Sequence, residues 1–239
     1  KCKSVKFIII PEGIINIGEQ AFFDCSCTSF KIPKNLTYLG DGALEMSTLT
    51  TIQSESPAFI ITENGFLVNT NGELLTAPDN EAIYFGGEID TCWSINKYAL
   101  AHSTFQSDFQ IDLSILGNGS PRATVSVGSY AFYGVRCSER ELHELTVVLP
   151  TKIANIGDHA FAESEVKSLS FLDGKPQNPV KLGTRAFSRC TSIESINFLD
   201  IFDEIPSSCF EYCTGVTSIT IPSTIKNIGT TSNAVVSNY

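Results

Sequence analysis

The stretch that decides the fold is Val216–Gly229, which reads Val-Thr-Ser-Ile-Thr-Ile-Pro-Ser-Thr-Ile-Lys-Asn-Ile-Gly. Its first half alternates apolar residues with Thr and Ser, which is typical of a half-buried strand. Pro222 ends that strand because proline has no N–H to give to a β-ladder. A closely similar string begins at Ile8 and continues to Cys25. A string that recurs across the chain indicates a repeat protein.

A second recurring string, Gly-x-x-Ala-Phe, gives the length of the repeat. It begins at Gly18, Gly40, Gly128, Gly157 and Gly183, and looser versions begin at Pro206 and Gly229. Gly18 and Gly40 are 22 residues apart, and steps of 23 separate residues 183, 206 and 229. The glycine suits a tight turn, through positive φ or through close approach of another backbone. One unit cannot bury its Phe alone, so neighbouring units must stack.

These repeats predict a right-handed solenoid with one parallel β-ladder and with turns or short helical segments on its other side. Because no linker divides the repeats, we expect a single domain over residues 1–239. The ladder should contain about nine short strands, near residues 7–10, 29–32, 50–53, 82–85, 110–114, 146–149, 168–172, 195–199 and 217–221.

Some segments depart from the repeat. Asn71-Gly72 lies between two apolar runs, which predicts a β-hairpin inserted near residues 59–77. The longer repeats carry extra residues at 142–144 and 173–179, which should emerge as surface loops. Residues 90–125 match the repeat poorly, so its register stays open there.

The 239-residue chain is acidic, with a formal net charge of −10. An acidic surface repels phosphate, so we expect binding neither to nucleic acid nor to anionic lipid. No apolar stretch approaches the roughly 20 residues of a membrane span, so we expect no membrane insertion.

The eight cysteines admit two interpretations, a disulfide framework or reduced thiols. Cys25, Cys190 and Cys213 each follow the repeat Phe by three residues, so they occupy one repeat position. A free cysteine packs well as a small apolar residue, and we therefore expect these three to be buried and unbridged. Whether the cysteines outside this position form disulfides stays open.

The combined string Leu/Val-x-x-Ile-x-Ile-Pro-x-x-Ile-x-x-Ile-Gly-x-x-Ala-Phe-x-x-Cys resembles the BspA-like leucine-rich repeat family. The match is strongest at residues 10–25 and 149–161, and the hairpin at 65–78 looks like a variant unit of that family. Residues 90–125 and 229–239 depart from the pattern. The resemblance implies a leucine-rich repeat solenoid and a bacterial or protist protein, secreted or at the cell surface, that adheres to host matrix proteins or to other cells.

Reactive groups are scattered. His102, His143 and His159 are far apart, and the chain has no His-Glu-x-x-His, P-loop or Gly-x-Ser-x-Gly motif. We therefore expect no catalytic, cofactor or metal site. His159 precedes the repeat Ala, a position that varies between repeats, and is interpreted as an ordinary surface residue. The acidic residues Asp173, Asp200 and Asp203 are interpreted as solvated rather than as metal ligands.

The outward positions of the expected strands form the candidate binding site, because solenoids bind partners along such extended faces. This row comprises Lys31, Gln53, Tyr84, Asp112, Ser170, Asn197 and Thr220, together with Ile9 and Val148. Tyr84 is the aromatic member and the first candidate for an anchor. The alternatives are a merely solvated ladder, or binding through the loops at 103–124 and 173–179.

Two functions fit the sequence. The first is a non-enzymatic, monomeric binding or adhesion module that recognises an extracellular protein or glycan of a host or neighbouring cell. The second is a passive spacer that presents other domains at the cell surface. An enzyme is possible only if its chemistry lies in residues 90–125. For either function we expect an extracellular or cell-surface location, with the signal peptide outside the supplied residues.

Overall fold

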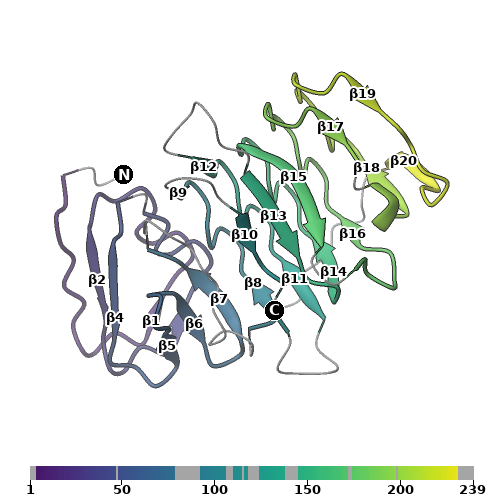
Figure 1. Cartoon of the computed structure of the whole chain (residues 1–239). Helices are drawn as coiled ribbons and strands as arrows, with labels where there is room; N and C mark the ends of the chain where they lie inside the picture. Colours follow the sequence, from purple (N-terminus) through teal and green to yellow (C-terminus); the bar gives the residue numbers. More distant parts are fainter. Residues whose placement is uncertain are drawn as a thin grey trace.

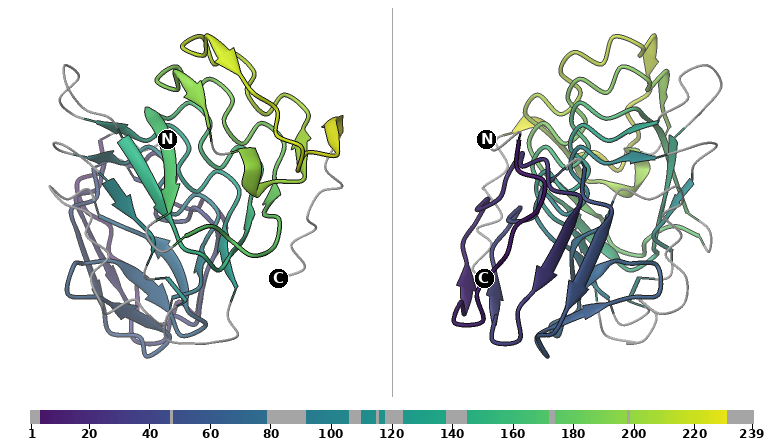
Figure 2. Two further views of the ribbon diagram at one scale, coloured as in Figure 1. Left: turned by 45° about the vertical axis from the view of Figure 1, so that its right-hand side comes forward. Right: turned by 90° about the vertical axis from the view of Figure 1, so that its left-hand side faces the viewer.

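The chain winds in successive coils from one end of the molecule to the other (Figures 1 and 2). The computed structural model describes residues 4–46, 48–78, 92–105, 110–114, 116–117, 124–137, 145–171, 174–197 and 199–230. In these residues the fold is a β-solenoid of about eight turns, with one short 3₁₀ helix, η2 (Leu199–Ile201). The solenoid expected from the repeats is therefore confirmed.

The Ile-x-Ile-Pro halves of the repeats form parallel strand pairs, which we call the strand ladder. Its strands are β2 (Ser29–Ile32) with β4 (Thr51–Ser54), β10 (Gln110–Asp112) with β13 (Leu145–Leu149) and β15 (Val166–Phe171), and β17 (Ser195–Ile196) with β19 (Ser218–Ile219). In β2, Phe30 and Ile32 are buried, whereas Ser29 and Lys31 are exposed, as the alternation predicts.

Seven of the expected strands are present in the strand ladder. Residues 7–10 are not a strand in the structure, although one was expected there. They lie in the first coil, at the end of the stack, and β2 pairs with β4 alone. The expected strand at 82–85 lies outside the described residues.

A second ladder, which the sequence did not predict, forms on the Ile-x-x-Ile-Gly halves of the repeats. Its parallel strands are β1 (Asn16–Ile17), β3 (Tyr38–Leu39), β8 (Ser94–Ile95), β11 (Val125–Val127), β14 (Ile153–Ile156), β16 (Lys181–Leu182), β18 (Glu204–Pro206) and β20 (Asn227–Thr230). A further parallel pair joins β9 (Thr104–Phe105) to β12 (Arg136–Cys137). The strands therefore form more ladders than the single one expected. Two residues are enough for backbone pairing between coils that are already stacked.

The Gly-x-x-Ala-Phe segments stack through a third set of backbone hydrogen bonds, which we call the turn ladder. The N–H groups of Tyr130, Phe132 and Gly134 donate to carbonyls of the next coil at 2.7–2.9 Å. In seven coils of the described part of the chain, the residue before the repeat Ala, or its equivalent, has φ between 54° and 63°: Gln20, Gly42, Tyr98, Tyr130, His159, Arg185 and Ser208. Six of these seven residues are not glycine, so stacking holds them in a conformation that L-residues ordinarily avoid.

The first glycine of that string serves close approach rather than positive φ. A Cβ on Gly157 would lie 2.5 Å from the backbone nitrogen of Ser129 in the preceding coil, and its φ is not in the left-handed region. Of the two reasons that the sequence offered for this glycine, the structure supports the second.

The interior is a column of stacked rings contributed by the repeat Phe. Phe132 and Phe161 have ring centroids 4.9 Å apart, Phe161 and Phe187 are 5.3 Å apart, and Phe187 and Phe210 are 5.7 Å apart. Adjacent rings are within 11° of parallel. Phe132, Phe161 and Phe187 have no exposed surface, so each coil buries the ring of its neighbour.

The inserted hairpin separates two apolar clusters, one in the first coils and one in the remaining coils. It consists of β6 (Leu67–Asn69) and β7 (Glu73–Thr76), antiparallel as predicted, with an added antiparallel strand, β5 (Phe59–Ile61). Val68 and Leu74 pack into the larger cluster, whereas Leu67 and Leu75 pack into the smaller one. Because β7 also pairs in parallel with β8, the hairpin is built into the coil stack.

The thiols at the shared repeat position link successive coils. The Cys190 thiol donates to the Phe161 carbonyl at 2.9 Å, and the Cys213 thiol donates to the Phe187 carbonyl at 3.0 Å. The seven described cysteines are free, as expected for the three repeat cysteines. Cys25 and Cys190 are buried, but Cys213 is only partly buried, which departs from the expectation. Cys213 lies near the end of the stack, where fewer atoms cover it.

We expect the repeat thiols to be unreactive toward a thiol reagent in the native protein and to react fully in denaturant without reductant. Burial raises the pKa of Cys190 to about 12 and also raises that of Cys213, so little reactive thiolate exists near neutral pH. Titration with a chromogenic disulfide reagent measures both states. Rapid reaction of Cys190 in the native protein, or its failure to react after unfolding, would contradict this assignment.

Candidate functional site

The outward row of the strand ladder begins with Lys31 and Gln53. These two residues are register partners in β2 and β4, and both are exposed. The Lys31 Nζ atom lies 2.6 Å from Glu55 Oε1, and this contact raises the pKa of Lys31. Lys31 and Gln53 therefore present a polar surface to solvent, as the alternation of apolar and polar residues in β2 predicts.

The middle of the row is less accessible than the sequence predicts. Asp112, Val148 and Ser170 are register partners across β10, β13 and β15. Asp112 and Ser170 are half-buried, and Val148 is only 1% exposed, so its expected place on an open surface is wrong. Alternation fixes the side of a strand on which a residue lies, but neighbouring segments decide whether that side meets solvent.

The far end of the row is open. Asn197 and Thr220 are exposed and follow directly after the register partners Ile196 and Ile219. Tyr84 lies outside the described residues, so no neighbour is assigned to it. The structure thus places Lys31 beside Gln53 and Asp112 in line with Ser170, in separate stretches of the strand ladder.

The turn ladder carries an aromatic column that the sequence analysis missed. The ring of Tyr130 stacks on Tyr98 at 5.0 Å and on His159 at 4.7 Å, with interplanar angles of 22° and 6°. Tyr133 meets Tyr130 and His102 edge-on, at 5.7 and 5.2 Å. All three stacked residues directly precede a repeat Ala. This recurrence of aromatic residues at one repeat position is the sequence signal from which the column could have been predicted.

His159 is more than the ordinary surface residue that was expected. Its ring is half-buried against Tyr130, and its Nδ1 atom is buried without a hydrogen-bond partner. Burial, followed by the charge of Arg185, lowers the pKa of His159 below its usual value. The neutral imidazole is therefore the form that fits the column.

Ion pairs continue this face toward the later coils. Arg185 Nε lies 3.0 Å from Glu211 Oε2, and Arg189 Nη1 lies 3.7 Å from Glu163 Oε1. The Arg189 guanidinium also lies 5.3 Å from the ring centre of Tyr212. The turn ladder thus offers tyrosine and arginine, residues that are enriched at binding hot spots.

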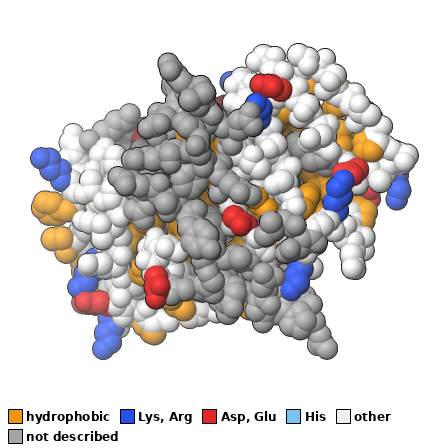
Figure 3. Space-filling model, in the orientation of Figure 1, with side chains coloured by type: hydrophobic (Ala, Val, Ile, Leu, Met, Phe, Trp, Pro, Cys, Tyr) orange, Lys and Arg blue, Asp and Glu red, His pale blue; other side chains and the backbone are white. Residues whose placement is uncertain are grey.

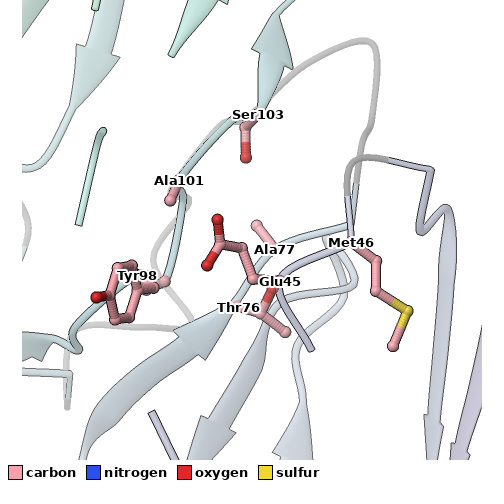
Figure 4. A pocket seen from close by; sticks show the side chains of 8 residues that line it. Glu45, Met46, Thr76, Ala77, Tyr98, Ala101 and Ser103 are labelled. Atoms are coloured by element: carbon pink, nitrogen blue, oxygen red, sulfur yellow. The ribbon is translucent and has the colours of Figure 1, made fainter. Parts of the chain in front are cut away.

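A pocket at the junction of the two apolar clusters contains the buried carboxylate of Glu45 (Figure 4). Met46, Thr76, Ala77, Tyr98, Ala99, Ala101 and Ser103 complete its lining. Glu45 Oε2 is buried without a hydrogen-bond partner, and Oε1 lies 3.6 Å from His102 Nε2. Burial, followed by the charge of Asp24, raises the pKa of Glu45 to about 7.

We expect Glu45 to make stability fall as the pH rises. Its folded pKa of about 7 exceeds its ordinary value of 4.5, so the folded state binds the proton more tightly than the unfolded state does. This contribution is fully present below the ordinary value and is lost as the pH rises through the folded pKa. Relative to Glu45→Gln, the wild type should lose about 1–3 kcal/mol of unfolding free energy between about pH 5 and pH 8.

Urea titrations at a series of pH values measure this difference. Glu194→Gln is the control, because the Glu194 side chain is 71% exposed. The lowered pKa of His159 gives stability a pH dependence of the opposite sign. Because His159 is present in both proteins, the difference between their profiles cancels its contribution. Parallel pH profiles for the wild type and Glu45→Gln would contradict the assignment.

The described residues contain no group of three or more His, Cys, Asp or Glu side chains placed to hold a metal ion. Asp200 forms an ion pair with Lys175, and Asp173 lies outside the described part of the chain. In the same described ranges, no helix has the length and apolarity needed to cross a bilayer.

The fold has known structural relatives. A leucine rich cell surface protein from Faecalibacterium prausnitzii matches with a TM-score of 0.68 and 22% identity, over 95% of this chain and 54% of that one. A leucine-rich repeat protein from Eubacterium ventriosum matches with a TM-score of 0.64 and 18% identity, over 92% and 62%. The pneumococcal vaccine antigen PcpA matches with a TM-score of 0.57 and 15% identity, over 89% and 54%. The chain thus spans only about half to three-fifths of their lengths.

No curated protein matches the sequence. The repeats themselves match the BspA type leucine rich repeat region in six copies, over residues 1–109 and 94–235. Together these two ranges include almost the whole chain, and the matched units are the same Ile-Pro and Gly-x-x-Ala-Phe strings that build the ladders. The chain therefore belongs to the BspA type leucine-rich repeat family.

Proposed function

We propose that this chain is a non-enzymatic recognition module, a single domain that acts outside the cytoplasm and binds an extracellular protein or glycan. The exposed side chains of the strand ladder carry the proposal. Lys31 and Gln53 at one end, and Asn197 and Thr220 at the other, project into solvent from coils whose backbones are hydrogen-bonded to one another. Such a scaffold presents side chains at a fixed spacing of about 4.8 Å per coil, and this preorganisation lowers the entropy cost of binding.

An extended partner suits this arrangement better than a small molecule does. The polar positions are distributed over many coils, so contact with several of them needs a ligand that runs along the stack. The hydroxyls of Thr146 and Ser168, 3.0 Å apart across β13 and β15, continue the polar character between the two open ends. A protein segment or a glycan chain supplies the donors and acceptors that such a row requires.

A surface or extracellular location is part of the proposal. A similar fold occurs in a protein described as a leucine rich cell surface protein, and another occurs in a vaccine antigen. The buried thiols are compatible with this setting, because burial raises the pKa of Cys190 and Cys213 and so protects them from oxidation and disulfide exchange.

Binding to immobilised fibronectin, laminin, collagen and a glycan array tests the proposal. We expect saturable binding to one of these probes, which Asn197→Arg weakens at least tenfold. The control is Thr151→Arg, which makes the same charge change at an exposed turn residue outside the strand ladder. If no probe binds, the spacer function is favoured; if both variants weaken binding equally, the strand ladder is the wrong surface.

A further inference from the structure

The turn ladder is interrupted where the second coil meets the coil that follows the inserted hairpin. In the continuous part of the ladder, alternate N–H groups of one coil donate to carbonyls of the next, as Asp24 does to Glu45 at 3.0 Å. In the described residues, no backbone hydrogen bond joins residues 42–46 to residues 97–101. The hairpin explains this interruption, because β7 rather than β3 pairs with β8.

The interruption leaves two carbonyl groups without donors. Ala99 and Ala101 occupy the repeat positions of Ala131 and Tyr133, whose carbonyls accept hydrogen bonds from the preceding coil. By the same geometry the carbonyls of Ala99 and Ala101 face residues 42–46, yet they accept no hydrogen bond from the described residues. Both residues line the pocket that contains Glu45. Buried carbonyl oxygens ordinarily have partners, so these two need a donor or a cation.

Glu45 is an unusual residue for its repeat position. In later coils that bury this position the residue is Ala101, Ala162 or Ser188. The Glu45 side chain is only 4% exposed, and its Oε2 atom has no hydrogen-bond partner. Burial of a carboxylate charge is unfavourable unless a positive charge compensates it. The pocket thus combines an unpartnered carboxylate oxygen with two unpartnered carbonyls.

Three titratable groups face the Glu45 carboxylate. Asp24 repels it, and Tyr98 is neutral near pH 7 because burial raises its pKa. His102 Nε2 lies 3.6 Å from Oε1, which is too far for a hydrogen bond. None of these groups contacts Oε2, so the compensating charge must come from elsewhere.

We propose that this pocket binds one small monovalent cation, such as Na⁺ or K⁺, with Glu45 as the charged ligand and the carbonyls of Ala99 and Ala101 as neutral ligands. The side chains of Thr76 and Ser103 line the same pocket, and Figure 4 shows the Ser103 hydroxyl directed toward the Glu45 carboxylate. Carboxylate and carbonyl oxygens are the ligands that hard cations prefer. The cation links the second coil to the following coil where the turn ladder does not.

Charge and size favour a monovalent ion. A single carboxylate neutralises one positive charge, so a divalent ion would remain only partly compensated. The pocket has room for about one water-sized particle, whereas Mg²⁺ usually keeps several waters and Ca²⁺ takes about six to eight oxygen ligands. The sequence predicts no metal site, because carbonyl ligands belong to the backbone and cannot be inferred from residue type.

Thermal unfolding at about pH 8 in sodium, potassium or tetramethylammonium chloride tests the proposal. Tetramethylammonium is too large for the pocket but supplies the same ionic strength. We expect Na⁺ or K⁺ to raise Tm by about 2–4 °C relative to tetramethylammonium. On the face that Figure 3 shows, the Asp and Glu side chains of the described residues are scattered rather than gathered in one patch, so weak surface binding should not distinguish the three salts.

Variants and pH locate the effect. Glu45→Gln should lose the difference between salts, whereas the exposed control Glu194→Gln should keep it. His102→Gln should also keep it, because the imidazole is not a ligand. Burial raises the pKa of Glu45 to about 7, so at about pH 5 a proton occupies the carboxylate and the difference should disappear.

Anomalous diffraction from wild-type crystals grown in rubidium chloride at about pH 8 locates the ion directly. We expect a rubidium peak beside the Glu45 carboxylate, and no such peak in crystals of Glu45→Gln. Equal Tm values in the three salts, a difference that persists in Glu45→Gln, a difference lost in His102→Gln, or a larger stabilisation by calcium chloride at equal ionic strength would overturn the proposal.

Discussion

Gly157→Ala is expected to lower the free energy of unfolding by about 3 kcal/mol or more, because the added methyl group has no space between coils. Its Cβ would lie 2.5 Å from the Ser129 nitrogen and 2.8 Å from the Gly128 carbonyl carbon. Both atoms belong to backbone that is held in the stack, so neither can move aside without breaking hydrogen bonds between coils. The loss should appear in a urea titration as a lower midpoint.

Gly18→Ala is the matched control for this prediction. Gly18 occupies the same repeat position, but a Cβ there would meet no atom within 4 Å. The expected change in the free energy of unfolding is within about 0.5 kcal/mol. Equal losses at the two positions would show that the glycine is required for its backbone conformation rather than for the approach of the preceding coil.

Phe161→Ala is expected to lower the free energy of unfolding by about 3–5 kcal/mol, because it leaves a cavity in the middle of the ring column. The Phe161 ring is fully buried and lies between Phe132 and Phe187, at 4.9 and 5.3 Å. Removal of this ring also takes away the surface against which both neighbours pack. Chemical denaturation measures the loss directly.

The comparison for this second prediction is Phe210→Ala, at the same repeat position near the end of the column. Phe210 is only partly buried, so its replacement removes less covered surface and should cost clearly less than Phe161→Ala. Equal costs would mean that the repeat Phe stabilises each coil locally. A smaller cost at Phe161 than at Phe210 would contradict the stacked core.

Much of the fold could be predicted because its signals recur. The 22- and 23-residue steps fixed the coil length, and the Asn71-Gly72 turn located the hairpin between β6 and β7. The second ladder gave no such signal, since strands as short as Asn16–Ile17 are too short to show alternation. Its pairing depends on the stacking of coils, which is a tertiary effect.

The candidate site was predicted less completely for a related reason. Alternation correctly placed Lys31 and Gln53 on the exposed side of their strands, but it also placed Val148 there, and Val148 is buried. The stacking of Tyr130 and His159 depends on left-handed backbone at residues that usually avoid it. Neither burial by neighbouring segments nor that backbone conformation can be inferred from residue type alone.

The proposal that the strand ladder is the binding face is tested most directly by lysine labelling of the chain, free and bound to the matrix probe that it captures. Lys31 lies on the strand ladder, whereas Lys34 and Lys226 are exposed outside its strands. We expect the probe to slow acetylation of Lys31 and to leave the rates at Lys34 and Lys226 unchanged. Protection of Lys34 and Lys226 with no protection of Lys31 would contradict the assignment of this face.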